Sequence, residues 1–452
     1  MAHMKTFKVG QQIELPVHGL GSSGEGVGYY QGYTVFVDGA LPEEIVAATL
    51  TECKKTYGRA ELIKIIKPSP LREKPVCHLF GKCGGCQLMH LDYQQQLVVK
   101  QQKVIDALQR IGKIKDPTVS PCLPSPNKLH YRNKIQLPVK AGANGLLVGL
   151  YARSSHDLVE VDSCHIHCDV GEKAFQITKR LIKESGIKAY DPQTGEGELR
   201  HILIKSSMSF QESLIILVTQ GIDREKLIPL ARKMMQQAPQ IKGVVQNINH
   251  IQGNIILGDS FSLIAGSDFI HERLGNLTFK ISPASFFQVN TPQAECLYAK
   301  ALELSEVKGN ETILDAYCGV GTISLYFAKH VKKVIGVECV PEAIVNANEN
   351  AKINEIQNAE FVCANSEDYI KSLDQIDLII LNPPRKGCEK GFLEGIQRLR
   401  PSKIIYISCD PATLARDLAY LSACGYAIKV VQPFDMFPQT AHVECVVKLE
   451  LA

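Results

Sequence analysis

Hydrophobic and polar residues alternate along most of residues 5–67, with the two-residue period of half-buried β-strands. The alternation is clear in 12–17, 33–37 and 44–48, and glycine-rich turns separate these stretches. Short strands between turn signals predict a small antiparallel β-barrel, OB-like or TRAM-like in kind. Its glycine-rich loop 19–28 fits an ordinary turn as well as an RNA contact. A basic strand pair follows, with the cations that phosphate contacts would need: Lys54, Lys55, Arg59, Lys64 and Lys67.

Prolines interrupt this alternation after residue 67 and begin a second region, which extends to residue 285. Helical periodicity predicts three helices here, at 92–111, 170–184 and 224–237. Strand patterns occur at 133–139, 146–151, 201–206, 214–219 and 243–249. This mixture predicts a central α+β domain over residues 68–285.

Residues 286–452 alternate strands and helices regularly, which is typical of a doubly wound α/β sheet of the Rossmann-like kind. Seven apolar stretches are predicted as its strands, at 312–317, 333–338, 360–363, 377–381, 403–409, 428–432 and 442–449. The sequence therefore predicts a multidomain protein whose C-terminal domain carries a parallel sheet.

The composition is that of an ordinary globular protein, with 45% hydrophobic and 21% charged residues in 452. A net charge of +3 is too small to establish nucleic-acid binding. We find no apolar run near the ~20 residues that span a bilayer and no secretory leader, so we expect a cytoplasmic protein without a membrane partner. The fifteen cysteines are an odd number, which favours reduced thiols that serve as ligands or catalysts.

The stretch Asp315-Ala-Tyr-Cys-Gly-Val-Gly-Thr322 follows a predicted strand and forms a candidate nucleotide-cofactor loop. Glycines let the backbone approach a ligand, and Glu338, about twenty residues further on, could accept hydrogen bonds from ribose hydroxyls. A dehydrogenase loop is the alternative, but Ser324 stands where the third glycine of Gly-x-Gly-x-x-Gly would be. The pattern is typical of S-adenosylmethionine enzymes and favours a methyltransferase.

Cys409 ends another predicted strand, just before a helix, where an enzyme would present a nucleophile. Its position alone fits an inert buried thiol equally well. His442 and Glu444 alternate on one strand and share a face, although a strand-end carboxylate is ordinarily a surface residue. The turn Asn382-Pro-Pro-Arg385 lacks the aromatic residue that stacks on the base in amino-group methyltransferases, which argues against N-methylation.

Four cysteines stand out by their spacing, in the pattern Cys-x5-Cys-x2-Cys with a distant fourth thiol: Cys77, Cys83, Cys86 and Cys164. The pattern differs from the paired Cys-x2-Cys knuckles of a zinc ribbon, and by itself it leaves zinc and an iron-sulfur cluster open. Nearby rival ligands are His78, His165, His167 and Cys168.

Several motifs together resemble the RNA 5-methyluridine methyltransferase family. They are Ser408-Cys-Asp-Pro411 with Thr413, Arg416 and Asp417, then Pro384–Gly387, Asp435–Glu444 and Ser285–Asn290. The likeness covers nearly the whole chain, because the barrel resembles a TRAM domain and the four cysteines resemble the family's iron-sulfur site. Those two additions point to the branch that methylates 23S ribosomal RNA.

The resemblance implies a covalent mechanism on uracil. Cys409 would add to C6 of the base, the methyl group would come from S-adenosylmethionine, and Glu444 would remove the C5 proton. It also implies a 4Fe-4S cluster on the four cysteines and a cofactor pocket formed by Gln288, Tyr317, Thr322, Glu338, Asn365 and Asn382. Arg132 and Lys134 would contact RNA phosphates, where the alternative is an ordinary solvated strand.

Two cofactor-pocket residues depart from the family pattern. Thr322 stands where asparagine is common, and Asn382 stands where an aspartate would accept the uracil N3 proton. A flipped Asn382 amide could instead donate to cytosine. The alternatives are therefore uridine methylation in tRNA, cytosine C5-methylation in RNA and a non-catalytic RNA-binding factor. We expect RNA, not DNA, as the partner of a monomeric enzyme.

Overall fold

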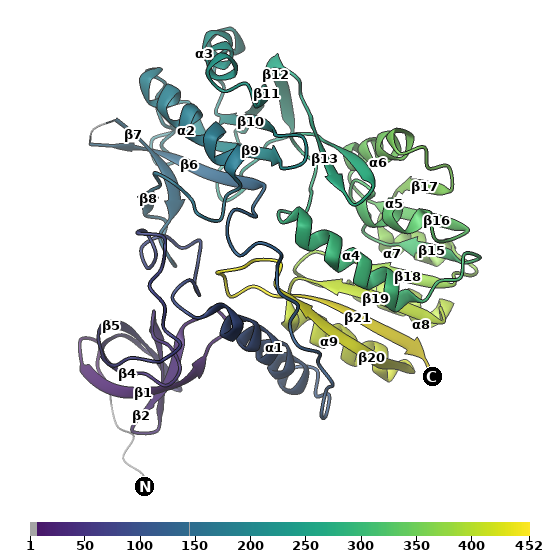
Figure 1. Ribbon diagram of the computed structural model, residues 1–452, viewed down its shortest axis with the longest axis horizontal. Coiled ribbons are helices and arrows are strands. Elements are labelled where there is room, and N and C mark those ends of the chain that lie inside the picture. Colours follow the sequence, from purple (N-terminus) through teal and green to yellow (C-terminus); the bar gives the residue numbers. More distant parts are fainter. Residues whose placement is uncertain (1–6, 144) are drawn as a thin grey trace.

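The computed structural model describes residues 7–143 and 145–452 (Figure 1), so residues 5 and 6 of the predicted first domain lie outside the described part. Five strands near the N-terminus close into a barrel in the order β1-β2-β3-β5-β4. Their bounds are β1 (Gln12–Leu20), β2 (Gly26–Tyr30), β3 (Tyr33–Asp38), β4 (Ile45–Cys53) and β5 (Tyr57–Lys67). The predicted barrel is confirmed, but β3 and β5 pair in parallel, so the expectation of a wholly antiparallel barrel is wrong at that pair.

A second sheet of seven strands follows, in the order β12-β11-β10-β9-β6-β7-β8. The strands are β6 (Lys134–Gly142), β7 (Gly145–Tyr151), β8 (Leu158–Glu160), β9 (Leu199–Ser207), β10 (Glu212–Thr219), β11 (Ile241–Ile248) and β12 (Ser260–Gly266). On one face it packs against the helices α2 (Asp169–Glu184) and α3 (Arg224–Gln237). Its other face carries Leu203, Leu214 and Val245, which share a core with the C-terminal domain.

The C-terminal sheet has the order β17-β16-β15-β18-β19-β21-β20. Strand β21 is antiparallel to both of its neighbours, β19 and β20, and the other neighbouring pairs are parallel. Its strands are β15 (Thr312–Asp315), β16 (Lys333–Glu338), β17 (Ala359–Cys363), β18 (Leu378–Leu381), β19 (Lys403–Ser408), β20 (Tyr426–Phe434) and β21 (Glu444–Leu451). The helices are α4 (Thr291–Ser305), α5 (Thr322–Ala328), α6 (Pro341–Ile353), α7 (Ser366–Tyr369), α8 (Lys390–Leu399) and α9 (Pro411–Ala423), with a short 3-10 turn η1 (Ile370–Ser372). Strands buried on both faces, as in Leu378–Leu381, are typical of such a parallel sheet.

Two elements of the predicted central region lie against the C-terminal sheet. Helix α1 (Tyr93–Arg110) packs on α9 and β20, and Val119 and Leu123 form bridges to β20. The hairpin β13 (Ile270–Leu274) and β14 (Leu277–Ile281) lies beside α4 and α6 (Figure 1). Because the core runs across the predicted boundary at residue 285, the three domain ranges stay predictions. Every helix in the described residues is too short or too polar to cross a bilayer.

Candidate active site

The carboxyl edge of the C-terminal sheet brings the predicted catalytic residues together. Cys409 directly follows the end of β19, and Glu444 begins the neighbouring antiparallel strand β21. Ser408 pairs with Cys445 across these two strands, which sets the thiol of Cys409 and the carboxyl of Glu444 at one edge. Ligands of open α/β sheets bind outside this edge, where the strands end.

The Glu444 carboxyl is almost completely buried, with 2% of the residue exposed. Its Oε2 atom has no hydrogen-bond partner within the described residues. Burial raises the pKa of Glu444 to about 7, and the Gln288 side chain opposes part of that rise. A carboxyl with such a pKa can accept a proton near neutral pH.

Cys409 is half-buried at the tip of a strand-turn-helix. Burial, and then the neighbouring Glu444 carboxylate, raise the pKa of the Cys409 thiol, while Arg385 lowers it. The turn is firmly built: Asp410 Oδ1 caps α9 by accepting from the backbone of Ala412 at 2.8 Å and Thr413 at 3.1 Å.

Arg385 is a feature that sequence reasoning noted only as a replaced aromatic residue. Its carbonyl accepts a hydrogen bond from Thr413 Oγ1 at 3.1 Å, which holds the Asn382–Arg385 turn beside Cys409. Desolvation by surrounding atoms and the charge of Arg385 lower the pKa of His442 to about 4, with smaller effects from Lys103, Lys100 and Arg132. Four cations therefore act on His442, and one of them, Arg385, also acts on Cys409.

The predicted cofactor loop lies at the same edge. The backbone N–H of Gly319 donates to Glu338 Oε2 at 3.2 Å, and Val340 donates to Oε1 at 3.1 Å, so the carboxylate is held in place at the loop. Gly321 has φ +82° at the start of α5, and a side chain at Gly319 would meet open space. An open backbone face beside a fixed carboxylate fits the adenosine part of S-adenosylmethionine.

The remaining predicted pocket residues surround this loop. Thr322 Oγ1 lies 3.1 Å from the hydroxyl of Tyr298, and Tyr317 donates to Glu367 at 3.3 Å. Asn365 is exposed after β17, and Asn382 follows β18, between the cofactor strand β15 and the Cys409 strand β19. Gln288 lowers the pKa of both Glu444 and Tyr298, so its side chain lies between the Glu444 carboxyl and the loop.

The chain is similar to known proteins over nearly its whole length. Residues 92–452 match the model of the tRNA (Uracil-5-)-methyltransferase family, and residues 6–63 match the TRAM domain. Uncharacterized RNA methyltransferases of Halalkalibacterium halodurans and Clostridium acetobutylicum are 40% and 41% identical, covering 97% and 98% of both chains respectively. The chain belongs to the RNA uracil-5-methyltransferase family.

A solved structure of the family resembles the whole chain. The Pyrococcus abyssi tRNA (uracil-54, C5)-methyltransferase, in complex with S-adenosyl-L-homocysteine, has 29% sequence identity and a TM-score of 0.78. It covers 97% of this chain and 100% of its own. The predictions of a methyltransferase that uses S-adenosylmethionine, acts on RNA and carries a TRAM domain are confirmed.

The four cysteines of the predicted cluster lie close together in the structure. Cys77, Cys86 and Cys164 pack around a small core, and the charges of Cys77, Cys83 and Cys164 all raise the pKa of Cys86 after burial. Within the described ranges, no group of three His, Cys, Asp or Glu side chains is arranged to hold a single metal ion. The 4Fe-4S cluster expected on these four cysteines therefore stays a prediction.

Two of the rival ligands have other neighbours. His167 Nδ1 lies 3.2 Å from a carboxylate oxygen of Glu172. Burial raises the pKa of Cys168, and the side chains that act on this pKa include Ser206 and Glu272 but none of the four predicted cysteine ligands. The ligand set of the predicted cluster therefore stays a prediction.

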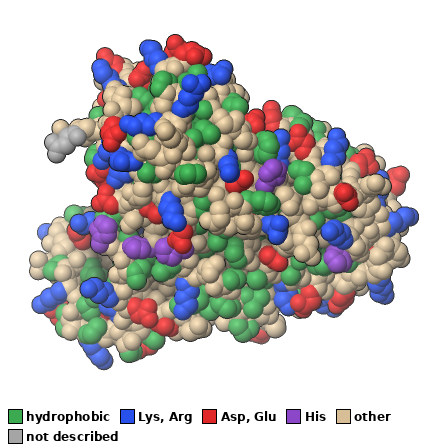
Figure 2. Space-filling view, turned by 45° about the horizontal axis from the view of Figure 1, so that its top comes forward, with side chains coloured by type: hydrophobic (Ala, Val, Ile, Leu, Met, Phe, Trp, Pro, Cys, Tyr) green, Lys and Arg blue, Asp and Glu red, His purple; other side chains and the backbone are tan. Residues whose placement is uncertain are grey.

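Arg132 lies between two sites. Its charge acts on Cys86 in the cysteine neighbourhood and on His442 beside the catalytic pair, while its Nε donates to the carbonyl of Lys134 at 2.8 Å. Basic and acidic side chains are interspersed over the face seen in Figure 2, without one continuous basic patch. The local gathering of cations near His442 is therefore a stronger sign of phosphate binding than the overall charge.

Proposed function

We propose that this protein methylates C5 of a uridine in 23S ribosomal RNA through a covalent adduct with Cys409, as a cytoplasmic monomer. The observation that carries the proposal is the adjacency of a half-buried thiol and a buried carboxyl whose pKa is raised to about 7. Uracil C5 is a poor nucleophile until a thiolate adds at C6, and a base must later remove the C5 proton. Cys409 and Glu444 supply these two groups.

Each step uses a residue at the sheet edge. The Cys409 thiolate adds to C6 of a base that has left its stack, and C5 becomes enolate-like. S-adenosylmethionine, held at the loop around Glu338, would supply the methyl group: C5 would bond to the methyl carbon, and the bond from that carbon to sulfur would break to release S-adenosylhomocysteine. Glu444 then accepts the C5 proton, and the carbon–sulfur bond to Cys409 breaks as the C5–C6 double bond returns. The Gln288 side chain, which interacts with the Glu444 carboxyl, would hold that carboxyl in place between the addition of Cys409 and the removal of the C5 proton.

We also propose that Cys77, Cys83, Cys86 and Cys164 hold a 4Fe-4S cluster with a structural role. Methyl transfer consumes no electrons, so redox chemistry is not needed for the reaction. The packing of three of these thiols around Met89, Tyr131 and Ile166 supports a role in ordering this segment.

Uridine methylation in tRNA is the second candidate. The Pyrococcus abyssi enzyme named for tRNA covers 97% of this chain, so domain content does not separate the two RNA classes. Asn382 bears on the base rather than on the RNA class, because its amide could accept from uracil N3 or, flipped, donate to cytosine N3.

The experiment uses RNA transcripts that contain 5-fluorouridine, one set from 23S ribosomal RNA and one from tRNA. Fluorine at C5 cannot leave as a proton, so the covalent adduct should accumulate in the presence of S-adenosylmethionine. We expect a stable protein–RNA complex in denaturing gels with 23S transcripts. A complex with tRNA alone would assign the second candidate, and RNA binding without any adduct or methyl incorporation would leave a non-catalytic binding factor.

Two variants assign the residues. Cys409→Ala should abolish both the adduct and turnover, whereas Cys424→Ala, a half-buried cysteine at the end of α9, should leave both unchanged. Glu444→Gln should trap the adduct on ordinary uridine RNA, because the methylated intermediate cannot lose its proton. Full turnover by Glu444→Gln would exclude this residue as the base.

A further inference from the structure

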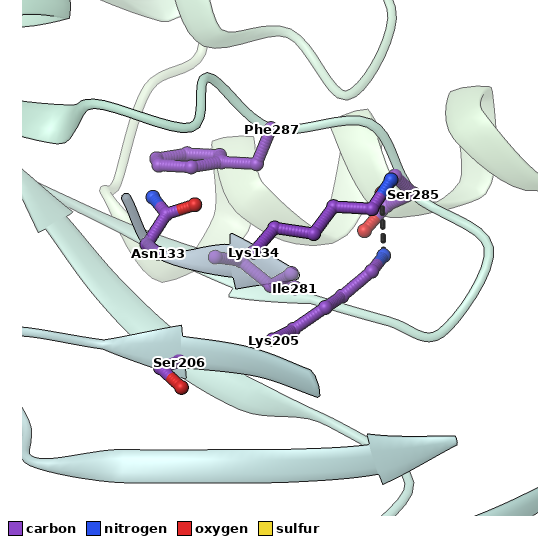
Figure 3. A pocket seen from close by; sticks show the side chains of 7 residues that line it. All are labelled: Asn133, Lys134, Lys205, Ser206, Ile281, Ser285 and Phe287. Atoms are coloured by element: carbon purple, nitrogen blue, oxygen red, sulfur yellow. Dashed lines mark hydrogen bonds between the residues drawn. The ribbon is translucent and has the colours of Figure 1, made fainter. Parts of the chain in front are cut away.

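A small pocket lies between the central sheet and the segment that leads into the C-terminal domain (Figure 3). It is lined by Lys134 from β6, Lys205 from β9 and Ser285 from the connecting segment, among others. The long side chains of both lysines extend toward Ser285.

The two lysines are directly opposite each other on paired antiparallel strands. Like charges in this register are destabilising, and burial adds to the cost. Lys205 is 4% exposed, and its Nζ donates to the carbonyls of Ser282 at 2.8 Å and Ser285 at 2.6 Å. These carbonyls solvate the Lys205 ammonium, but neither carries a charge that could balance it.

Lys134, unlike Lys205, has an ammonium group that could bind a ligand directly. It is half-buried, and within the described part of the chain its ammonium pairs with no carboxylate and no carbonyl. Burial, and then the charge of Arg132, lower the pKa of Lys134, while burial and Lys134 lower that of Lys205. Among the described residues no carboxylate forms an ion pair with either lysine, so a bound anion would favour their charged forms over the neutral forms that burial favours.

The pocket is tied to the catalytic pair. Asn133, next to Lys134, donates from its side chain to the Gln288 carbonyl at 2.8 Å and from its backbone to the Val289 carbonyl at 2.8 Å. Ser285 is three residues from Gln288, whose side chain acts on Glu444. An anion in the pocket would therefore lie close to a nucleobase that has reached Cys409.

We propose that Lys134 and the underlying Lys205 bind one phosphodiester of the substrate RNA, next to the nucleotide whose base reaches Cys409. This inference rests on the proposed function. It adds Lys205 and the Ser285 segment to the RNA-binding residues expected from the sequence. The cofactor's carboxylate is the less suitable anion, because the pocket belongs to the central sheet whereas the cofactor loop follows β15 in the other sheet.

The test measures the dissociation constant of the full-length protein for a single-stranded, uridine-rich RNA oligonucleotide over a range of salt concentrations. For Lys134→Gln we expect about tenfold weaker binding at low salt and a log–log salt slope that is smaller by about 1. Lys205→Met should give the same change of slope, and Lys134→Arg should retain the wild-type slope. Lys242→Gln, an exposed lysine on β11 of the same domain, is the matched control and should change neither.

The outcomes are separable. Wild-type slopes in both Lys134→Gln and Lys205→Met, with melting temperatures that show folded protein, would overturn the proposal. Weaker S-adenosylmethionine binding by calorimetry, with an unchanged RNA slope, would assign the anion to the cofactor and also overturn it. If the wild type showed no RNA methylation but Lys134→Gln still reduced the salt slope of RNA binding, the proposed function would fail and the phosphate site would be supported.

Discussion

Cys409 and Glu444 are coupled in a way that fits the order of the reaction. A thiolate and a carboxylate side by side repel each other, and the Glu444 charge raises the pKa of Cys409. The thiolate therefore forms most readily while Glu444 is protonated. In the proposed reaction, bonding of sulfur to C6 would remove this negative charge, and Glu444 could then ionise to act as the base. A pKa of about 7 allows both states near neutral pH.

Arg385 supplies the opposing charge, and its removal is the prediction at this scale. In Arg385→Gln the cation that lowers the pKa of Cys409 is lost, so that pKa rises and less thiolate exists at neutral pH. A rise of about one unit would reduce the thiolate fraction about tenfold. We expect about a tenfold slower single-turnover rate at pH 7, with a rate–pH curve shifted to higher pH.

Peptide-resolved alkylation of Cys409 across pH checks this directly. Lys386→Gln is the matched control, because Lys386 is the neighbouring exposed cation and pairs with Glu389 at 2.6 Å. An unchanged alkylation midpoint in Arg385→Gln would show that the guanidinium does not act on the thiol.

The sequence identified the residue types of the site but not their environment. Cys409 and Glu444 follow from motifs, and both lie at the predicted sheet edge. Their roles stay predictions. Glu444 looked like a surface carboxylate because strand alternation cannot show what covers a strand end, and the fold buries it. The effect of Arg385 depends on a turn from a different strand, which no local pattern encodes.

At the scale of elements, long periodic stretches were predicted well. The bounds of α3 and β16 agree with the prediction, since each has a clear period and clear end signals. The parallel pairing of β3 with β5 could not be predicted, because alternation is the same in parallel and antiparallel neighbours. The hairpin β13–β14 was missed, although Gly275-Asn276 between two alternating stretches is a recognised hairpin signal.

The turn before α5 gives a prediction at this scale. Gly321 has φ +82°, and an added Cβ would lie 2.9 Å from the ring of Phe361. Gly321→Ala therefore strains the backbone and displaces the cofactor loop, and we expect at least tenfold weaker S-adenosylmethionine binding by calorimetry. Gly425→Ala is the control, because Gly425 has φ +96° but open space around it. It should lose about 1 kcal/mol of stability and keep full cofactor affinity.

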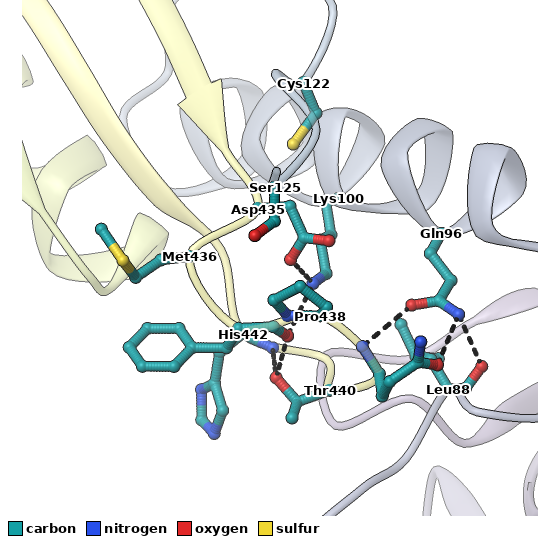
Figure 4. A network of polar contacts seen from close by, with 12 residues as sticks. Leu88, Gln96, Lys100, Cys122, Ser125, Asp435, Met436, Pro438, Thr440 and His442 are labelled. Carbon is teal, nitrogen blue, oxygen red and sulfur yellow. Dashed lines mark hydrogen bonds and ion pairs between the residues drawn. The ribbon is translucent and has the colours of Figure 1, made fainter. Parts of the chain in front are cut away.

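Across the whole molecule, distant parts of the chain fasten the segment 435–441, which leads into Glu444 (Figure 4). Lys100 of α1 forms a buried ion pair with Asp435 and donates to the Phe437 carbonyl at 3.1 Å. Gln87 and Leu88, which follow the cysteine motif, donate to the carbonyl of Gln439. Lys103 donates at 2.8 Å to Ala441 and also to Ser22 of the barrel. The barrel, the cysteine segment and α1 thus all contact the segment that leads into Glu444.

The Lys100–Asp435 pair allows stability and positioning to be separated. Lys100→Met leaves a buried carboxylate without its cation, and we expect the free energy of unfolding to fall by about 3–5 kcal/mol in urea titrations. Lys300→Met breaks the partly exposed pair with Glu303 on α4 and should cost less than about 1 kcal/mol.

The double variant Lys100→Met/Asp435→Asn decides between the two roles. Removing both charges should recover most of the lost stability, because no unpaired ion remains buried. The segment before Glu444 would still lack the hydrogen bond from Lys100 to Phe437, which the methionine cannot make. If the contact positions the base, the double variant should bind S-adenosylmethionine normally but convert the covalent RNA adduct to product more slowly. Wild-type turnover in the stable double variant would instead limit the ion pair to a folding role, and Glu444 would then owe its position to β21 and Gln288 alone.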